Sequence, residues 1–287
     1  MTGLCLWSGT LAGHDVWTRI RAAGRAGFAS LSVAPNELAT VVADGDEGRL
    51  DAELDTYALR LACLDPVVAW LPDPVPAHPA HRVYASVGAA QCLDLAERFG
   101  IRLVNVIDVT WRRLPSTASP CLAEFAARAA RRGIGVVVEA QVYSAIPNLA
   151  TALDLCRGTG PNVSLMVDAW HFFRDGTNRI ADLAGLPVGA LQVSDGPAWC
   201  GGDLVAESST GRLMPGRGGF DLTRLATAIP PGCLVGPEVF TSRVPVARTY
   251  DVAMTALTTT RDVLLAAAGR RSRPAAPELD RAGLRPR

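Results

Sequence analysis

Short apolar segments alternate with longer amphipathic segments along most of the chain. Eight of the apolar segments are rich in Leu, Val, Ile and Ala, as the buried strands of a parallel sheet usually are. The third lies in a longer apolar stretch in which the register is uncertain. We expect strands at residues 4–7, 29–33, within 59–71, and at 103–107, 135–139, 164–168, 190–194 and 234–239.

The amphipathic segments between these runs predict helices. Several of them end in glycine just before the next apolar run, which is a frequent helix C-cap. Alternating strands and helices favour a parallel sheet, and eight such units predict an α/β fold, the (β/α)8 TIM barrel. The alternative, an open doubly wound sheet, is disfavoured because no G-x-G-x-x-G motif follows the first strand. The helices are expected at residues 14–27, 80–100, 121–133, 144–158, 218–230 and about 246–268.

The predicted barrel makes up a single domain, residues 1–268, which is about the usual length of this fold. Residues 269–287 are rich in Pro and Arg and contain no apolar run. A segment of this composition buries too little apolar surface to fold, so we expect a disordered C-terminal tail.

The charge balance points away from nucleic acids. The chain has 28 basic and 28 acidic residues in 287, without a long block of either sign. A small-molecule partner is therefore expected, and no nucleic acid. Every basic residue is arginine, which excludes mechanisms that need a lysine Schiff base or a lysine general base.

The seven cysteines show neither a CxxC pair nor zinc-finger spacing, and they are read as small core residues of a reducing compartment. The N-terminal segment lacks the features of a signal peptide, and no apolar run approaches membrane-spanning length. We therefore expect a cytoplasmic protein without a membrane partner, and allow for a homodimer.

Three predicted strands finish in a carboxylate. Glu139, Asp168 and Glu238 each end an apolar run, while Gln192 lies in the strand between the last two and Asp195 follows it. In TIM barrels the catalytic residues lie at these strand ends. Carboxylates held together repel one another unless a cation joins them, so this pattern favours one divalent ion. Oxygen ligands suit Mn²⁺ or Mg²⁺, with Co²⁺ or Zn²⁺ as alternatives. Taken singly, each acid could instead be a helix N-cap or a surface residue.

Five segments in this half of the chain resemble a known family. VVVEA, DAWH, LQVSD, RLMPGRGGFDL and GPEVF, in this order, are similar to motifs of the sugar phosphate isomerase/epimerase family with the xylose isomerase-like barrel. The likeness in architecture spans roughly residues 1–265, and its specific part residues 135–240. The resemblance implies that the metal ligands are Glu139, Asp168, Gln192 and Glu238.

The resemblance also implies roles around the metal. The two glutamates, Glu139 and Glu238, would act as acid and base on a proton next to a carbonyl group, with His171 among the catalytic residues and Arg212 binding substrate. The alternatives are a packing role for His171 and a solvated loop position for Arg212. For Arg217 neither reading is favoured.

One position departs from the pattern. Many epimerases of the family carry His where this chain has Gln192, and a Glu, Asp, Gln, Glu set also resembles that of the 3-dehydroshikimate dehydratases. We therefore expect a metal-dependent isomerase or epimerase of a sugar-like or cyclic polyol substrate, with a dehydratase (lyase) as the alternative. A multi-zinc DNA-cleaving barrel would need more than the four histidines present, and a degenerate accessory barrel would lack the acids.

Most of the tryptophans fall at or just after predicted strand ends, and only Trp17 lies inside a predicted helix. Rings gathered at the barrel mouth would give a binding pocket with apolar walls, which predicts a substrate with an apolar ring or face. The alternative is that they fill the core. The tryptophans expected at the substrate are Trp7, Trp70, Trp111, Trp170 and Trp199.

Overall fold

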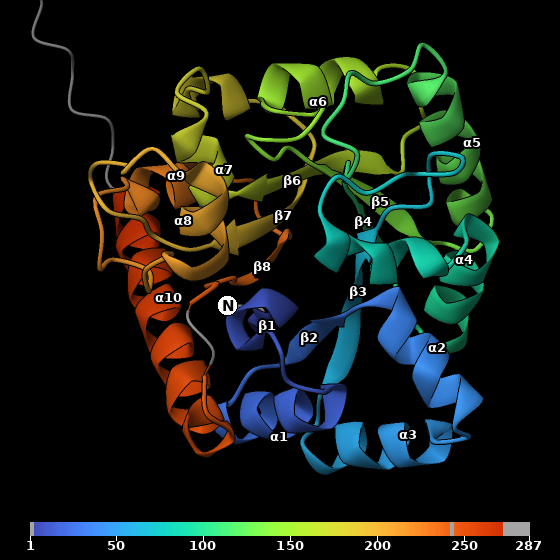
Figure 1. The fold of residues 1–287 in the computed structure, drawn as a ribbon. Coiled ribbons are helices and arrows are strands. Elements are labelled where there is room, and N and C mark those ends of the chain that lie inside the picture. Colours follow the sequence, from blue (N-terminus) through green and yellow to red (C-terminus); the bar gives the residue numbers. More distant parts are fainter. Residues whose placement is uncertain (1–2, 242–243, 272–287) are drawn as a thin grey trace, which may run out of the picture.

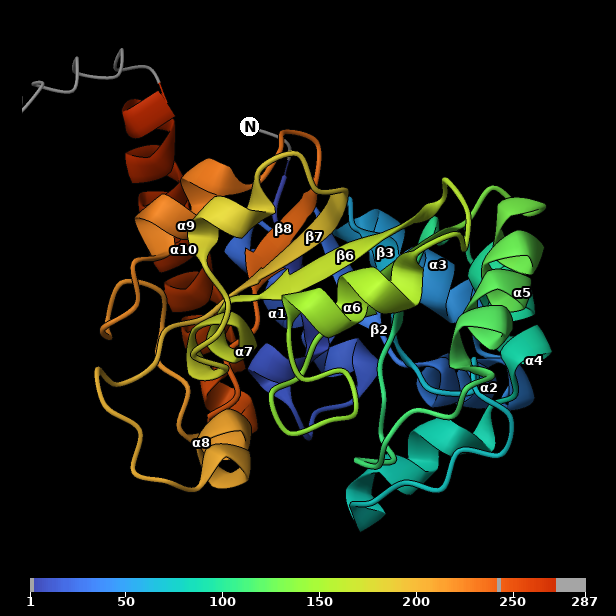
Figure 2. The same ribbon diagram turned by 90° about the horizontal axis from the view of Figure 1, so that it is seen from above.

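In a computed structural model, which describes residues 3–241 and 244–271, eight parallel strands pair in chain order within one sheet. Helices surround the sheet on its outer side (Figures 1 and 2). The predicted TIM barrel is thus confirmed. The strands are β1 (Cys5–Leu6), β2 (Ser30–Val33), β3 (Arg60–Val67), β4 (Leu103–Val106), β5 (Gly135–Glu139), β6 (Val163–Asp168), β7 (Val188–Val193) and β8 (Leu234–Pro237).

The last strand returns to the first, so that the barrel is nearly closed. The backbone N–H of Trp7 donates a hydrogen bond to the carbonyl oxygen of Pro237 at 3.2 Å. A Cβ atom at Gly236 would lie 1.6 Å from the carbonyl oxygen of Cys5, so only glycine allows the two backbones to approach this closely.

The helices agree with the predicted alternation, with two differences. The segment expected as one helix at residues 80–100 begins as a 3₁₀ helix, Pro79–Ser86, and its α-helix starts only after Gly88. Four of the described α-helices, α2, α3, α7 and α8, lie where none was expected. The α-helices are α1 (Val16–Ala26), α2 (Pro35–Ala43), α3 (Glu47–Thr56), α4 (Ala89–Arg98), α5 (Ala118–Ala130), α6 (Leu149–Cys156), α7 (Ala169–Arg174), α8 (Leu204–Thr210), α9 (Leu222–Ala228) and α10 (Thr249–Arg271).

Two apolar layers hold the barrel together. The larger one packs the strands against the surrounding helices. The smaller one fills the barrel interior, so the barrel is a packed core and not a pore. Its buried members are Cys5, Trp7, Cys63, Val137, Met166 and Ala190.

Helix α10 extends through Arg271, three residues beyond the predicted end of the domain. The Arg271 side chain donates to the carbonyl oxygens of Ala226 and Ile229, which ties the end of α10 to α9. The remainder of the predicted tail, residues 272–287, lies outside the described residues. Across the described residues no helix is both long and apolar enough to cross a membrane.

Candidate metal centre

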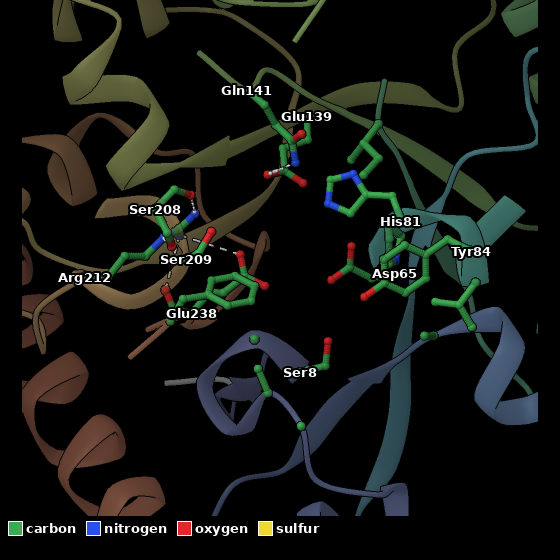
Figure 3. A pocket seen from close by; sticks show the side chains of 18 of the residues that line it. Ser8, Asp65, His81, Tyr84, Glu139, Gln141, Ser208, Ser209, Arg212 and Glu238 are labelled. Carbon is green, nitrogen blue, oxygen red and sulfur yellow. Dashed lines mark hydrogen bonds and ion pairs between the residues drawn. The ribbon is translucent and has the colours of Figure 1, made fainter. Parts of the chain in front are cut away.

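A cavity of about 380 Å³ lies at the carboxyl ends of the strands. Three of its acids come from strand ends: Asp65 lies in β3, Glu139 ends β5 and Glu238 directly follows β8. Figure 3 shows them facing the same space. The other polar side chains that line it are Ser8, His14, Arg19, Asn36, Glu37, His81, Tyr84, Gln141, Tyr143, His171, Ser208, Ser209 and Arg212.

Asp168 ends β6 and begins α7. Its Oδ1 accepts a hydrogen bond from the backbone N–H of His171 at 2.9 Å, so Asp168 caps the helix. The N-cap alternative is therefore correct for this acid, but it does not exclude a metal role. Ligand atoms of Glu139, Asp168 and His171 all lie within 4.8 Å of one another, which is close enough to share one ion.

Arg212 is buried beside this group, and a solvated loop position is wrong for it. Its Nη1 donates to Asp168 Oδ2 at 2.6 Å and lies 3.8 Å from Glu238 Oε2. Its Nε donates to the carbonyl oxygen of Ser208. Arg212 therefore brings one fixed positive charge into a cluster of buried carboxylates. Arg217, by contrast, is exposed.

His171 is also buried, and the backbone N–H of Val142 donates to its Nδ1 at 3.3 Å. Burial lowers the pKa of His171 to about 3, although the nearby Asp168 opposes the shift. The imidazole is therefore neutral at physiological pH, and a neutral ring nitrogen can bind a metal or accept a proton.

Burial and the charges of neighbouring groups shift the pKa values of the buried acids. Burial raises the pKa of Glu139 to about 8, and the neighbouring Asp168 and Asp65 add to the shift. Burial, followed by the charge of Asp65, also raises the pKa of Glu238 well above its usual value. Burial alone would raise the pKa of Asp168 too, but Arg212 and His171, through their charges and their hydrogen bonds, together outweigh burial and hold that pKa below its usual value. A divalent ion would supply the missing charge.

Gln192 offers a further sign that an ion fits. Its side chain is buried in β7, next to Asp168 in the register of β6 and β7, and its Oε1 has no hydrogen-bond partner. A buried amide oxygen without a partner costs about 1–3 kcal/mol, and a hard cation can serve as that partner. Carboxylate oxygens, an amide oxygen and an imidazole nitrogen together form a donor set suited to a divalent metal.

Asp195 has a different role. Its Oδ1 accepts hydrogen bonds from the backbone N–H groups of Gly196 and Phe220 at 2.9 and 3.0 Å. Asp195 thus holds the loops that follow β7 and does not belong to the ligand-atom group found among the described residues.

Sequence reasoning missed two residues of the site, Asp65 and Asn105. The Nδ2 of Asn105, in β4, donates to Asp65 Oδ1 at 2.8 Å and to Glu139 Oε2 at 2.6 Å. Asp65 lies in the apolar stretch with uncertain register, directly before Pro66. A carboxylate at the end of that apolar run was the available signal.

The five tryptophans are not among the described side chains that line the cavity. Trp7, Trp70 and Trp170 are buried, so the core-filling alternative describes them, whereas Trp199 is 80% exposed. Trp111 contacts Tyr143, with ring centroids 5.2 Å apart. Large rings near strand ends turned into the core because burial there is more complete than at an open mouth. The described rings that do line the cavity are His14, His81, Tyr84, Tyr143, His171 and Phe240.

Comparisons with solved structures agree with this fold. The IolI protein with a bound zinc atom superposes with a TM-score of 0.75 at 17% identity, over 92% of this chain and 98% of that chain. A D-allulose 3-epimerase from Methylomonas sp. gives a TM-score of 0.67 at 16% identity, over 91% and 98%. The probable 3-DHS dehydratase AsbF from Bacillus anthracis gives 0.67 at 11% identity, over 91% and 99%.

No curated protein matches the chain. The family model of the xylose isomerase-like TIM barrel matches residues 20–259. That range covers most of the barrel and all of the candidate metal ligands. The chain therefore belongs to the xylose isomerase-like TIM barrel family.

Proposed function

We propose that this protein is a divalent-metal-dependent isomerase or epimerase that acts on a sugar-like or cyclic polyol substrate with a hydroxy-carbonyl group. The observation that carries the proposal is the pair of buried glutamates, Glu139 and Glu238, placed at different sides of one cavity (Figure 3). Structural neighbours named as a D-allulose 3-epimerase and an L-ribulose 3-epimerase support this reaction class.

The metal would be held by Glu139, Asp168, Gln192 and Glu238, with His171 as a further candidate ligand. When bound, a divalent cation supplies Lewis-acid stabilisation of the negative charge that develops on substrate oxygens. Oxygen donors favour Mn²⁺ or Mg²⁺, whereas the imidazole and the zinc-bound structural neighbour favour zinc.

The two glutamates would move the proton. One carboxylate takes the proton from the carbon next to the carbonyl group, and the other returns a proton from its own side of the cavity. Glu139 is held for this task from both sides, since Gln141 Nε2 donates to its Oε1 at 3.2 Å and Asn105 Nδ2 to its Oε2 at 2.6 Å. Each of its oxygens keeps a second acceptor position for the substrate.

A dehydratase is the second candidate, because Gln192 stands where an epimerase of this family often has histidine and one structural neighbour is named as a probable dehydratase. The first step would be the same proton abstraction. The β-hydroxyl group would then leave as water after taking a proton. Glu238 is the candidate to donate that proton, because it faces the cavity from a different side than Glu139.

The test is a screen of ketoses and cyclic polyols in deuterated water with Mn²⁺, followed by mass spectrometry. An isomerase gives a product of unchanged formula that carries deuterium, whereas a dehydratase gives a product lighter by one water. Elemental analysis of the purified protein should find about one divalent ion per chain, and chelation should abolish turnover. Full turnover after chelation would contradict the proposal.

A further inference from the structure

The cavity has a second polar wall that the metal centre does not use. Asp65, His81 and Tyr84 lie on the side of the cavity opposite Arg212 and Ser208 (Figure 3). The Asp65 residue is only 5% exposed, yet it lines the cavity. A buried carboxylate at a cavity wall retains acceptor positions that only a ligand or water can fill.

Asp65 is held at a fixed place relative to the proton-transfer machinery. The Asn105 side chain is fully buried, and its two N–H bonds point to Asp65 Oδ1 and Glu139 Oε2, at 2.8 and 2.6 Å. One amide therefore spaces the two carboxylates. Any group that binds to Asp65 is placed at a defined distance from Glu139.

The charges around the cavity decide which group this can be. Two arginines are found among the described residues that line it, and each is paired with a carboxylate: Arg212 with Asp168 at 2.6 Å, and Arg19 with Glu37 at 2.5 Å. The chain has no lysine. A phosphate group beside Asp65 would meet a second anion without a free cation to offset the repulsion. A hydroxyl group can donate to the carboxylate at no such cost.

We propose that Asp65 is a substrate-binding residue that accepts a hydrogen bond from a hydroxyl group of an unphosphorylated polyol, at the end of the substrate away from Arg212. The inference rests on the proposed function, because the spacing set by Asn105 matters only if Glu139 transfers a proton. Tyr84 and His81 form the edges of this subsite.

A metal role is the first alternative for Asp65. The ligand-atom group found among the described residues contains Glu139, Asp168 and His171 and includes neither Asp65 nor Glu238, so the metal content of Asp65→Asn decides between the two roles. A purely structural role is the second alternative, because the side chains of Asn105 and Ser32 both hydrogen-bond to the Asp65 carboxylate. Both alternatives are separated from the proposal by the experiment below.

The experiment compares Asp65→Asn with the wild-type protein. Asparagine keeps the shape and can still accept the hydrogen bond from Asn105, but it removes the charge. The matched control is Asp44→Asn, which makes the same change at an exposed position after α2. The probes are D-fructose, myo-inositol and their monophosphates, and binding is measured by saturation-transfer NMR and competition titration in Mn²⁺.

For the wild type we expect binding of at least one neutral probe, with its phosphate ester at least about tenfold weaker. In Asp65→Asn the neutral probe should bind about tenfold more weakly, as for the loss of a hydrogen bond to a charged group, with the metal content unchanged. The Asp44→Asn control should match the wild type.

Four results would overturn the inference. Two concern Asp65→Asn: unchanged affinity for the neutral probe, or loss of the divalent ion. The other two concern the wild type: tighter binding of the phosphate esters, or no binding of either neutral probe. Turnover does not enter these measurements. An active isomerase with unchanged binding in Asp65→Asn would therefore refute the role of Asp65 and leave the proposed function intact.

Discussion

The two walls of the cavity differ in how their charge is balanced. The β5–β8 wall presents Glu139, Glu238 and the buried Arg212 to the cavity. Asp168, which pairs with Arg212, and the unpartnered amide oxygen of Gln192 are buried and do not line the cavity themselves. The wall formed by β3 and the loop after it presents Asp65, which the buried Asn105 of β4 holds in place, and the described part of this wall provides no cation that could meet a ligand. A divalent cation would therefore balance the negative charge at the first wall, whereas the second wall suits neutral hydrogen-bond donors.

The two walls also differ in construction. On the first, the acids stand at the ends of hydrogen-bonded strands, where the backbone is held on both sides. On the second, Tyr84 and His81 come from the 3₁₀ helix Pro79–Ser86, part of a connecting segment. Among related TIM barrels the loops vary more than the strands do. We therefore expect the catalytic groups on the first wall and the residues that select the substrate on the second.

The largest expected effect comes from breaking the first wall. Glu139→Gln and Glu238→Gln should each lower kcat by at least about 10²-fold, because each removes a group that transfers a proton. Steady-state kinetics on the substrate found in the screen measures this, and circular dichroism checks the fold. The matched control is Glu124→Gln at an exposed position of α5. Turnover near the wild-type level in either variant, with metal bound, would refute the acid and base assignment.

The second prediction concerns Asp65 on the second wall and the dependence of the free energy of unfolding on pH. Burial raises the pKa of Asp65 to about 6, against the lowering effect of the Asn105 hydrogen bond. Between about pH 4 and pH 7 the folded state therefore keeps a proton that the unfolded state has released, so stability falls as the pH rises through this window. In metal-free protein, Asp65→Asn should become more stable than the wild type by on the order of 2–3 kcal/mol at pH 7, and by little at pH 4.

Chemical denaturation at several pH values in the presence of a chelator measures this difference. The exposed Asp44→Asn variant should follow the wild type at every pH. A stability difference between Asp65→Asn and the wild type that is the same at pH 4 and pH 7 would show that Asp65 does not carry a raised pKa.

Gln192→Leu separates metal binding from packing within the first wall. If Gln192 Oε1 is a metal ligand, the variant should bind Mn²⁺ about tenfold more weakly than the wild type. The metal-free variant should be more stable than the metal-free wild type, because the substitution removes an unsatisfied buried polar group. Metal titration and denaturation of the metal-free protein measure the two effects. Gln91→Leu, at an exposed position of α4, is the control. Weaker metal-free stability with unchanged affinity would assign Gln192 to packing alone.

The smallest effect is expected at Trp199, one of the tryptophans expected at the substrate from the sequence. Because Trp199 is 80% exposed and does not line the cavity, Trp199→Ala should leave kcat/KM within about twofold of the wild type. The same kinetic assay measures it. A loss well beyond twofold would show that the segment around Trp199 reaches the bound substrate.

Most strands could be predicted from the sequence, because each is a short apolar run that polar or turn-forming residues bound on both sides. The segment 135–139 was predicted with the bounds that β5 has, and 164–168 differs from β6 by one residue. The prediction was weakest at 59–71, where two apolar runs meet at Asp65 and Pro66 and the strand register stayed uncertain. The prediction therefore missed Asp65 as a site residue. It also missed the two hydrogen bonds by which Asn105 connects Asp65 to Glu139.

The sequence by itself determined the barrel and the acids at the strand ends of β5, β6 and β8, because both depend on local order: apolar runs, their spacing and the residue that follows each run. Tertiary structure alone decided that Arg212 pairs with Asp168, that Asn105 joins Asp65 to Glu139, and that Trp7 fills the barrel instead of the cavity. These pairings join residues far apart in the chain. They are set by burial and by the need of buried charges and polar atoms for partners, which appears only once the strands are assembled.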